Sequence, residues 1–335
     1  MVNVTLYLRK ECHLCDQTRL DLDEIQNRIP HNLVLIDIDS DLALQDKFTL
    51  DIPVVEVGPY RLRYPFSKKD LEMTLSAAED RRTQLEKVDD GGYKKAVERG
   101  SKLSKTDRFS FWISKHYMLV VNLLLLFYVG LPFLAPVFKE SGANGVAELI
   151  YKVYRPLCHQ WSFRSWFLFG EQAYYPHSAA KIPAVLTFEQ VSGITDVNDP
   201  TRIQARLFEG NELLGFKVAL CERDIAIWGA ILLFGVIFTI TGRKIKSLPL
   251  WIWILIGIAP IALDGFSQLV SQLDLFSLQG ILNYRESTPF LRTLTGFLFG
   301  FTTAWFGFPT VEEVMSDTRR LLTKKFAVIN SNLQK

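Results

Sequence analysis

The fold of the N-terminal part is decided by the stretch VNVTLYLRKECHLC, residues 2–15. Its first half, Val2 to Leu8, is a short apolar run typical of a buried strand, and a helix-like stretch follows Cys15. Cys12 and Cys15 therefore stand where a strand meets a helix. The positive end of a helix stabilises a thiolate on the first cysteine, and a gap of two residues lets the second cysteine close a disulfide. The motif favours thiol-disulfide chemistry.

Two other interpretations of the motif stay open. The first is half of a zinc site, which usually takes a second pair of cysteine or histidine ligands at close spacing. The next cysteine in the chain is Cys158, so no cysteine pair follows nearby. The second is a retained fold in which both cysteines are structural.

The segments after the motif predict a βαβ unit and the rest of a small domain. Leu20, Leu22 and Ile25 recur at helical spacing within Asp16 to Ile29. A buried strand is predicted over residues 33–38, a short helix over 42–48, a strand over 52–57, a last strand over 61–64 and a final helix from 67 to about 78.

The strand over residues 52–57 opens with a proline, Pro53. An Ile-Pro-Val sequence at this distance from a CxxC motif is where thioredoxin folds place a cis-proline whose loop packs beside the active thiols. On Cys12, Cys15, Pro53 and the order of elements, residues 1–78 resemble the glutaredoxin-like branch of the thioredoxin superfamily. The resemblance implies that Cys12 is the nucleophile, that Cys15 is the resolving thiol, and that Pro53 forms part of the groove for the substrate backbone.

The chain departs from glutathione-binding glutaredoxins after the proline strand. Those proteins usually carry a Gly-Gly turn followed by Asp, whereas this chain has Gly58-Pro59-Tyr60 and then Arg61. The resemblance therefore gives no support for glutathione as a cofactor.

Apolar residues are concentrated after position 115 of this 335-residue chain. Four runs approach the roughly 20 residues that cross a bilayer as a helix. They are residues 117–138, 225–241, 248–270 and 290–308. Leu123 to Leu126 is apolar on every face, which a helix of a soluble core does not need. The predicted fold class is an α/β thioredoxin-like domain plus an α-helical transmembrane domain of about four spans.

Charge next to the spans predicts an orientation. Residues 93–115, 243–246 and 319–325 are rich in Lys and Arg, and the positive-inside rule places them in the cytoplasm. The N-terminus has no signal peptide pattern. We therefore expect an integral protein of the cell's inner or plasma membrane with both termini cytoplasmic. The predicted domains are 1–78, a charged juxtamembrane tether 79–115, a membrane domain 116–308 with an outer loop 139–224, and a cytoplasmic tail 309–335.

The expected partners follow from this organisation. They are the lipid bilayer and a protein substrate with a thiol or disulfide. The net charge of +2 does not indicate nucleic-acid binding, because the basic residues stand beside spans where topology explains them. Within the outer loop, residues 171–218 are rich in turn formers, and short strands are predicted over 185–188 and 204–208.

A second group of candidate residues gathers at the predicted outer ends of the spans. Ionisable groups beside a span are costly unless paired, so Asp264 with Arg292 or Arg223 is a candidate functional site. A structural ion pair that orients helices is the alternative. The whole set of candidates is Cys158, His159, Gln160, Arg164, Cys221, Arg223, Asp264, Gln268, Arg285, Arg292 and Thr295.

Five short motifs contain most of these residues. They are Cys-His-Gln at 158–160, Arg-Ser-Trp at 164–166, Cys-Glu-Arg at 221–223, Asp-Gly-x-x-Gln at 264–268 and Arg-x-x-Thr-Gly at 292–296. With these motifs the stretch from about Ile150 to Phe308 resembles a family of predicted membrane proteins of unknown function. Several members have a further cysteine where this chain has Asp224. The resemblance locates a site and implies no reaction.

Three interpretations of Cys158 and Cys221 compete. In an oxidising compartment the two thiols would form a disulfide that closes the loop between them. A redox-active pair could instead exchange electrons with a membrane quinone as cofactor. The third interpretation is a metal site formed by Cys158, His159 and Cys221, although adjacent Cys and His ligands are geometrically awkward.

The function predicted from these features is a membrane-anchored thiol-disulfide oxidoreductase or redox-sensing protein, with the CxxC dithiol in its cytoplasmic domain. An alternative from another class is a membrane protein that binds or transports a small solute or lipid headgroup and is regulated by the thioredoxin-fold domain.

Overall fold

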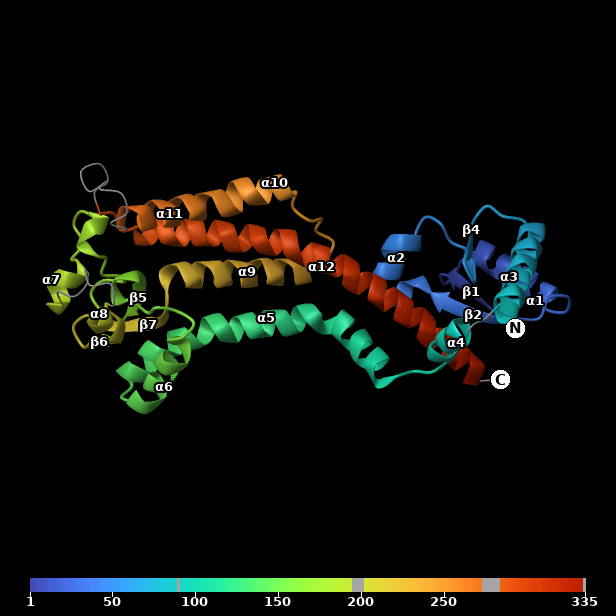
Figure 1. The fold of residues 1–335 in the computed structure, drawn as a ribbon, viewed down its shortest axis with the longest axis horizontal. Coiled ribbons are helices and arrows are strands. Elements are labelled where there is room, and N and C mark those ends of the chain that lie inside the picture. The colour runs from blue at the N-terminus through green and yellow to red at the C-terminus, as the bar shows by residue number, and fades with distance from the viewer. Residues whose placement is uncertain (89–90, 195–201, 273–283, 334–335) are drawn as a thin grey trace. The chain divides into compact units, whose positions relative to one another are not determined.

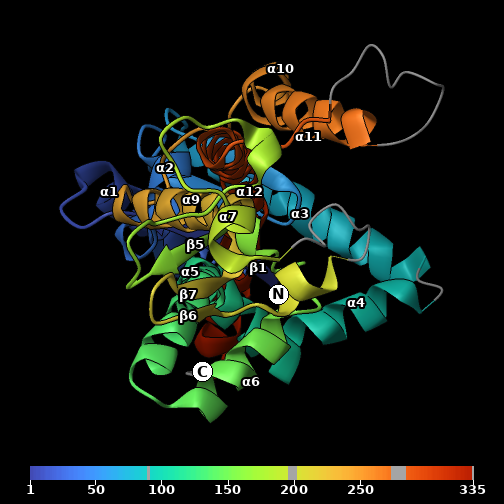
Figure 2. The ribbon, with the colours of Figure 1, turned by 90° about the vertical axis from the view of Figure 1, so that its left-hand side faces the viewer.

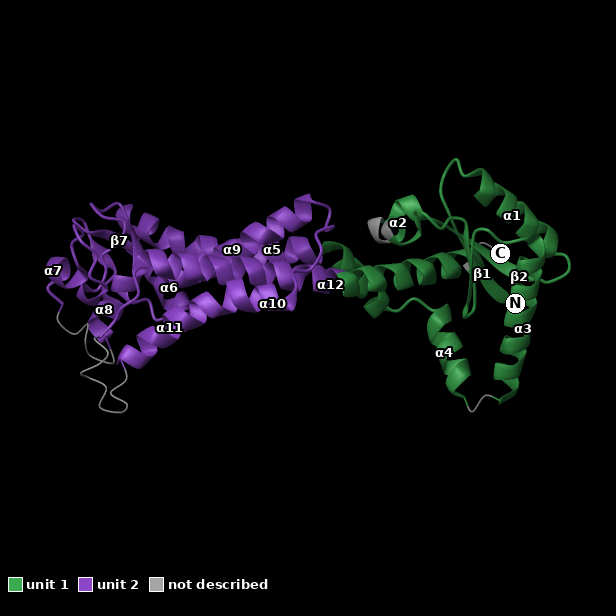
Figure 3. Cartoon of the chain, turned by 90° about the horizontal axis from the view of Figure 1, so that it is seen from above, with its two compact units in different colours: residues 1–116, 313–335 green, residues 117–312 purple. Residues whose placement is uncertain are grey.

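The computed structural model describes residues 1–88, 91–194, 202–272 and 284–333. The chain divides into two compact units, one of residues 1–116 with 313–335 and one of residues 117–312 (Figure 3). Two helices, α5 (Lys105–Glu140) and α12 (Pro289–Leu333), contribute to both units.

The first unit is built on a mixed four-stranded sheet in the order β2-β1-β3-β4 (Figure 1). The strands are β1 (Val2–Leu8), β2 (His31–Asp37), β3 (Val54–Val57) and β4 (Tyr60–Arg63). Helix α1 (His13–Ile25) joins the parallel strands β1 and β2, which makes the predicted βαβ unit. Strand β3 pairs antiparallel with β1, and β4 pairs antiparallel with β3 at the edge of the sheet. This arrangement is the predicted thioredoxin-like fold.

Two helices cover one face of this sheet. Side chains alternate along a strand, so Val4 and Leu6 of β1 point to the same face. There they pack with Leu22 and Ile25 of α1 and with Leu71 of α3 (Lys68–Val88). Leu20, which was predicted on the buried side of this first helix, is 57% exposed.

The other face is covered partly by the end of the chain. Tyr7 points to this face and packs with Phe48 of α2 (Leu42–Phe48), with ring centroids 4.5 Å apart. Ala327 and Val328 of α12 pack against the same cluster. The last helix therefore completes the core of the first unit.

The predicted tether is helical over most of its length. Helix α3 was expected to end near residue 78 but extends to Val88, because the added residues are mainly strong helix formers. Helix α4 (Gly92–Ser101) follows after Gly91, whose φ of +93° suits glycine. Helix α5 then begins with a cap in which Ser104 and Asp107 exchange hydrogen bonds.

The second unit contains the four apolar runs. Among the residues that the structure describes, three helices are long and apolar enough to cross a membrane, namely Lys105–Glu140 (α5), Glu222–Ile240 (α9) and Leu250–Gln272. The third consists of α10 (Leu250–Ile252), a π-helical segment (Trp253–Ile258) and α11 (Ala259–Gln272). The fourth predicted span, 290–308, lies within α12, where Arg292 and several threonines lower the mean hydropathy.

Aromatic rings and glycines bring these helices together. Phe234 of α9 contacts Phe301 of α12 with ring centroids 5.3 Å apart, and Trp253 stacks on Phe306 of α12 at 5.1 Å. At Gly300 of α12 a Cβ atom would lie 2.1 Å from the carbonyl oxygen of Ile227, so the backbones of α9 and α12 meet closely there.

One end of these helices carries a small folded layer, which we call the end layer (Figures 1 and 2). It has a sheet in the order β5-β7-β6. Its elements are α6 (Asn144–Tyr154), β5 (Ser165–Leu168), α7 (Phe188–Ser192), α8 (Ile203–Leu207), β6 (Gly210–Asn211) and β7 (Gly215–Cys221).

Both strands predicted within residues 171–218 were wrong. The stretch 204–208 is mostly α8, and Phe188 begins α7 where 185–188 was predicted to be extended. A capping box between Thr187 and Gln190 starts α7. Short apolar runs of this length are compatible with a strand or with a helix. In the run at 185–188, the capping box favours the helix.

Candidate functional site

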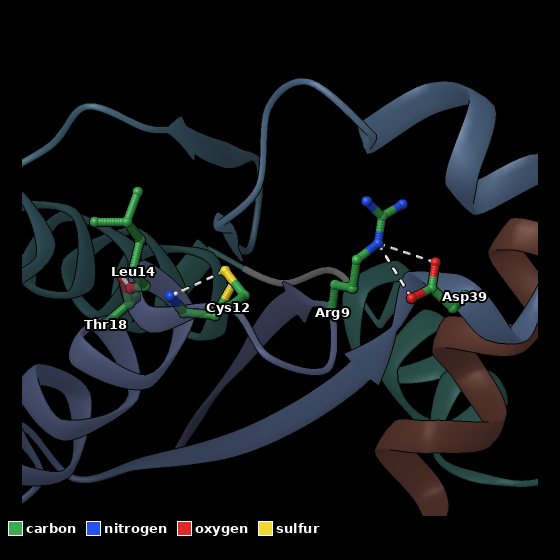
Figure 4. Close-up of a disulfide and its surroundings, with 6 residues drawn as sticks. Arg9, Cys12, Leu14, Thr18 and Asp39 are labelled. Atoms are coloured by element: carbon green, nitrogen blue, oxygen red, sulfur yellow. Dashed lines mark hydrogen bonds and ion pairs between the residues drawn. A yellow bond between two sulfur atoms is a disulfide. The ribbon is translucent and has the colours of Figure 1, made fainter.

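The first candidate site is the cysteine pair at the start of α1. Cys12 and Cys15 form a disulfide, with their Cα atoms 5.2 Å apart (Figure 4). Cys12 is the N-cap residue of α1, and its sulfur accepts a hydrogen bond of 3.3 Å from the Cys15 backbone N–H. Cys12 is half-buried while Cys15 is buried. An incoming group therefore reaches the sulfur of Cys12 more easily.

The loops around the disulfide are held by local contacts. Arg9, on the loop after β1, forms an ion pair of 3.0 Å with Asp39 (Figure 4). The hydroxyl of Thr18 donates to the Leu14 carbonyl within α1. The peptide bond between Ile52 and Pro53 is cis and directly precedes β3, as the sequence predicted.

A polar network at the end of the spans is centred on Asp264 of α11. Arg223 of α9 forms an ion pair with one carboxylate oxygen, and Arg285 donates to the other at 2.8 Å. The hydroxyl of Ser287 donates to the same carboxylate at 2.7 Å. The predicted pairing of Asp264 with Arg223 is present, and the alternative pairing with Arg292 is wrong.

Arg292 forms an ion pair with Glu286 instead. The same carboxylate accepts two hydrogen bonds from Arg164, at 2.6 and 2.8 Å, and one from the Gln268 amide at 3.1 Å. Arg292 also donates to Gln268 at 3.2 Å. Residues 285–287 pass beside α11 immediately before α12, so Arg285 reaches Asp264 while Arg292 faces Glu286.

Three further candidates lie outside this network. Gln160 is buried, and its amide nitrogen ties the Tyr151 carbonyl of α6 to the Ala219 carbonyl of β7. His159 is exposed and rests on the ring of Trp161, at 5.0 Å between centroids. The hydroxyl of Thr295 donates to Leu291 within α12. These contacts are structural.

Cys158 and Cys221 meet beside this end of α9 without a disulfide. The sulfur of Cys158 accepts a hydrogen bond of 3.4 Å from the Cys221 N–H, and the sulfur of Cys221 accepts one of 3.5 Å from the Asp224 N–H. The hydrogen bond between the two thiols lowers the pKa of Cys158, although burial opposes this shift.

Two segments of the chain match known protein families. Residues 3–76 match the family described as "Glutaredoxin-like domain (DUF836)", and residues 212–306 match the family described as "Predicted membrane protein (DUF2085)". The chain joins a glutaredoxin-like domain to a predicted membrane protein domain. Cys12, Cys15 and Pro53 lie in the glutaredoxin-like domain. The members of the polar network from Arg223 to Arg292 lie in the membrane protein domain, whereas Arg164 precedes the matched residues.

The relatives carry no further functional information. An uncharacterized protein of Methanocaldococcus jannaschii, MJ1492, is 25% identical over 211 residues, which cover 61% of this chain and 97% of that protein. No solved structure matches the chain.

The glycine of the Arg-x-x-Thr-Gly motif has a packing role in the membrane protein domain. A Cβ atom at Gly296 would lie 2.8 Å from the carbonyl oxygen of Arg223. Helix α12 therefore approaches α9 closely beside the arginine that pairs with Asp264. The motif therefore supports the network in two ways, through the close backbone contact at Gly296 and through the charge of Arg292.

Sequence reasoning missed several residues of this region. Glu286 and Ser287 lie shortly before the fourth apolar run. The rule that an ionisable group beside a span needs a partner, which indicated Asp264, applies equally to Glu286. Glu222 is buried, and neither of its carboxylate oxygens has a hydrogen-bond partner among the described residues.

Lys217 is the other missed residue. It is fully buried on β7, and its ammonium group donates to the Gln160 and Arg206 carbonyls, both at 2.7 Å, and to Ser162 at 3.3 Å. Burial lowers the pKa of Lys217 to about 7. Its position within an apolar strand, between Phe216 and Val218, gave no sign of this role.

Proposed function

We propose that this redox-related membrane protein is a membrane-anchored thiol-disulfide oxidoreductase that acts through Cys12 and Cys15. The observation that carries the proposal is the disulfide at the N-terminus of α1 in a glutaredoxin-like domain, with Cys12 more accessible than Cys15. Its substrate class is a protein disulfide or dithiol.

The position of Cys12 suits a nucleophile. A helix N-terminus carries partial positive charge and favours a thiolate over a thiol. The Cys15 N–H, 3.3 Å from the sulfur of Cys12, supplies a hydrogen-bond donor to that thiolate. Leu14, between the two cysteines, is 41% exposed and offers an apolar contact to an incoming protein segment.

The exchange conserves atoms and electrons in two steps. In the reduced domain the Cys12 thiolate attacks one sulfur of a substrate disulfide, so a mixed disulfide forms and the other substrate sulfur leaves as thiolate. The Cys15 thiolate then attacks the sulfur of Cys12 and releases the second substrate thiolate, which takes up a proton. The substrate gains two electrons and the domain is left with the Cys12–Cys15 disulfide. A second dithiol of the same chemical class returns the electrons.

The membrane protein domain serves in this proposal as the anchor. Within the described part of the chain, three helices are apolar and long enough to span a bilayer, and large side chains such as Leu124, Phe127, Trp251 and Leu255 are exposed on them. Residues from both ends of the chain belong to the first unit, which supports an even number of spans with the termini on one side. The basic flanks support the cytoplasmic side for both.

The test uses the full chain in detergent with a peptide disulfide as substrate and a small dithiol as reductant. We expect Cys12→Ser to abolish turnover. Cys15→Ser should accumulate a mixed disulfide between Cys12 and the peptide, visible by mass spectrometry. The matched control is Cys158→Ser with Cys221→Ser, which removes the other two thiols and should leave turnover unchanged. Retention of turnover in Cys12→Ser, or its loss in the control, contradicts the proposal.

A further inference from the structure

The geometry points to a metal site in the membrane protein region, formed by Cys158, Cys221 and Asp224 and suited to a thiophilic divalent cation such as Zn²⁺. One ligand atom from each residue lies within 4.8 Å of the other two. This inference does not depend on the function proposed for Cys12 and Cys15.

Two segments far apart in the sequence supply the three ligands. Cys158 follows α6 in a turn where its N–H donates to the Tyr154 carbonyl at 3.0 Å. Cys221 ends β7 and is also the N-cap residue of α9, and Asp224 lies in the first turn of that helix. The spacing of Cys221 and Asp224 therefore places a thiol and a carboxylate on the same helical turn, and Cys158 supplies the third ligand from another segment.

The sulfurs are already oriented by backbone donors. The Cys221 N–H points to the sulfur of Cys158, and the Asp224 N–H points to the sulfur of Cys221. Hydrogen bonds of this kind fix the direction of a ligand atom and offset the negative charge of a metal-bound thiolate. Each bond also joins two members of the cluster, so the ligands hold one another in place.

The surroundings limit access of water. Cys158 packs in a cluster with Ala135, Ala147 and Tyr151, and its exposed fraction is 7%. Cys221 and Asp224 are half-buried. Two thiolates and a carboxylate brought this close together repel one another, and a divalent cation compensates their charge. The donor set therefore matches a cation better than a neutral ligand.

The dimensions fit a tetrahedral ion. Zn²⁺ binds sulfur at about 2.3 Å, which separates two tetrahedral sulfur ligands by roughly 3.7 Å. Starting from atoms within 4.8 Å, side-chain movements of about 1 Å complete the geometry. Three protein ligands leave a fourth position for water or a small ligand. His159, the third ligand expected from the sequence, is exposed and rests on Trp161 instead.

The experiment uses the full chain in detergent in a Cys12→Ser, Cys15→Ser background, so that Cys158 and Cys221 are the remaining thiols. After anaerobic reduction it is titrated with Co²⁺, whose bonds to thiolate produce a charge-transfer absorption, and Zn²⁺ is then added to displace it. We expect one Co²⁺ per chain and loss of the absorption in Cys158→Ser and in Cys221→Ser.

Two substitutions at Asp224 keep the test decisive if a cysteine variant does not fold. We expect Asp224→Asn to weaken Co²⁺ binding at least tenfold, and Asp224→Cys to retain binding with a stronger charge-transfer absorption. His159→Ala is the matched control, next to a ligand in the chain, and should bind as the background protein does. Absence of thiolate absorption in the reduced protein, or full affinity in Asp224→Asn, overturns the site. The site is also overturned if Cys158 and Cys221 are isolated as a disulfide and the reduced protein binds no Co²⁺. In that case the two cysteines serve as a covalent cross-link.

Discussion

Lys324, near the end of α12, donates a hydrogen bond of 2.7 Å to the carboxylate of Glu56 on strand β3. Arg61 of β4 donates to the other carboxylate oxygen at 2.8 Å. Burial raises the pKa of Glu56, but these hydrogen bonds outweigh it and lower the pKa below its usual value. The charged form of Glu56 therefore anchors the last helix of the chain to the sheet that carries the redox pair. Since α12 begins in the second unit, one continuous helix belongs to both parts of the protein.

We expect Glu56→Gln to loosen the end of α12. The substitution leaves one neutral acceptor oxygen in place of two charged ones, so at least one of the charge-assisted hydrogen bonds, worth about 1.5–3 kcal/mol, is lost. Hydrogen exchange of the backbone amides in residues 320–333 should become faster by about tenfold at neutral pH, because a loss of about 1.4 kcal/mol corresponds to one factor of ten. The matched control is Glu72→Gln, whose ion pair with Arg28 is exposed and should contribute little. Unchanged exchange in Glu56→Gln would show that Ala327 and Val328 hold the helix without the ion pair.

Lys217 should make the stability of the second unit depend on pH. Its pKa is about 7 in the folded protein and about 10.4 in the unfolded chain. Between these values the unfolded chain binds more protons, so the free energy of unfolding rises with pH from about 7 to about 10. Below pH 7 both states are protonated and the full cost of burying the charge remains.

The comparison of Lys217→Met with the wild type isolates this contribution. The variant has no ammonium group to titrate, so we expect the free energy of unfolding of the wild type to rise by about 2.7 kcal/mol relative to the variant between pH 6 and pH 9. The difference between their melting temperatures, followed by tryptophan fluorescence in detergent, measures this gain. Lys152→Met, at an exposed position of α6, serves as the control and should show no such dependence. A difference independent of pH would mean that Lys217 titrates normally.

Glu222 and Glu286 should respond oppositely to the same substitution. Both are buried, but Glu286 is paired with Arg164 and Arg292, whereas the oxygens of Glu222 have no hydrogen-bond partner among the described residues. Breaking a buried pair costs about 3–5 kcal/mol, so Glu286→Gln should lower the melting temperature by roughly 10 °C. Glu222→Gln removes an unpaired buried carboxyl and should leave the melting temperature equal or higher. An equal fall in the melting temperature of both variants would contradict the distinction between a paired Glu286 and an unpaired Glu222.

Local chemistry explains which features the sequence could predict. The order from β1 to β4, the position of Cys12 at a helix start and the cis peptide at Pro53 all depend on residues close together in the chain. The cover that Ala327 and Val328 give to the sheet could not be predicted in this way, because they are distant in sequence from the strands they meet.

The pairing inside the polar network shows the same limit. The cost of an unpaired charge beside a span correctly indicated that Asp264 needs a partner. It could not distinguish Arg285 from Arg292, because that choice depends on where residues 285–287 pass beside α11. The same rule applies to Glu286, but the sequence does not show that its partners are Arg164 and Arg292.

The last prediction concerns the sides of the membrane. Residues near both termini share the first unit, so Cys12 and a cysteine introduced by Asn332→Cys should be accessible from one side, and a cysteine introduced by Leu186→Cys in the end layer from the other. Each is placed alone in a chain whose other cysteines are serine, and a membrane-impermeant maleimide is applied to intact cells and to inverted vesicles. We expect labelling at positions 12 and 332 in inverted vesicles and at position 186 in intact cells, because the basic flanks favour cytoplasmic termini. Labelling of positions 12 and 332 from opposite sides would exclude an even number of spans, and labelling of both from outside would reverse the orientation and place the Cys12–Cys15 pair in the outer compartment.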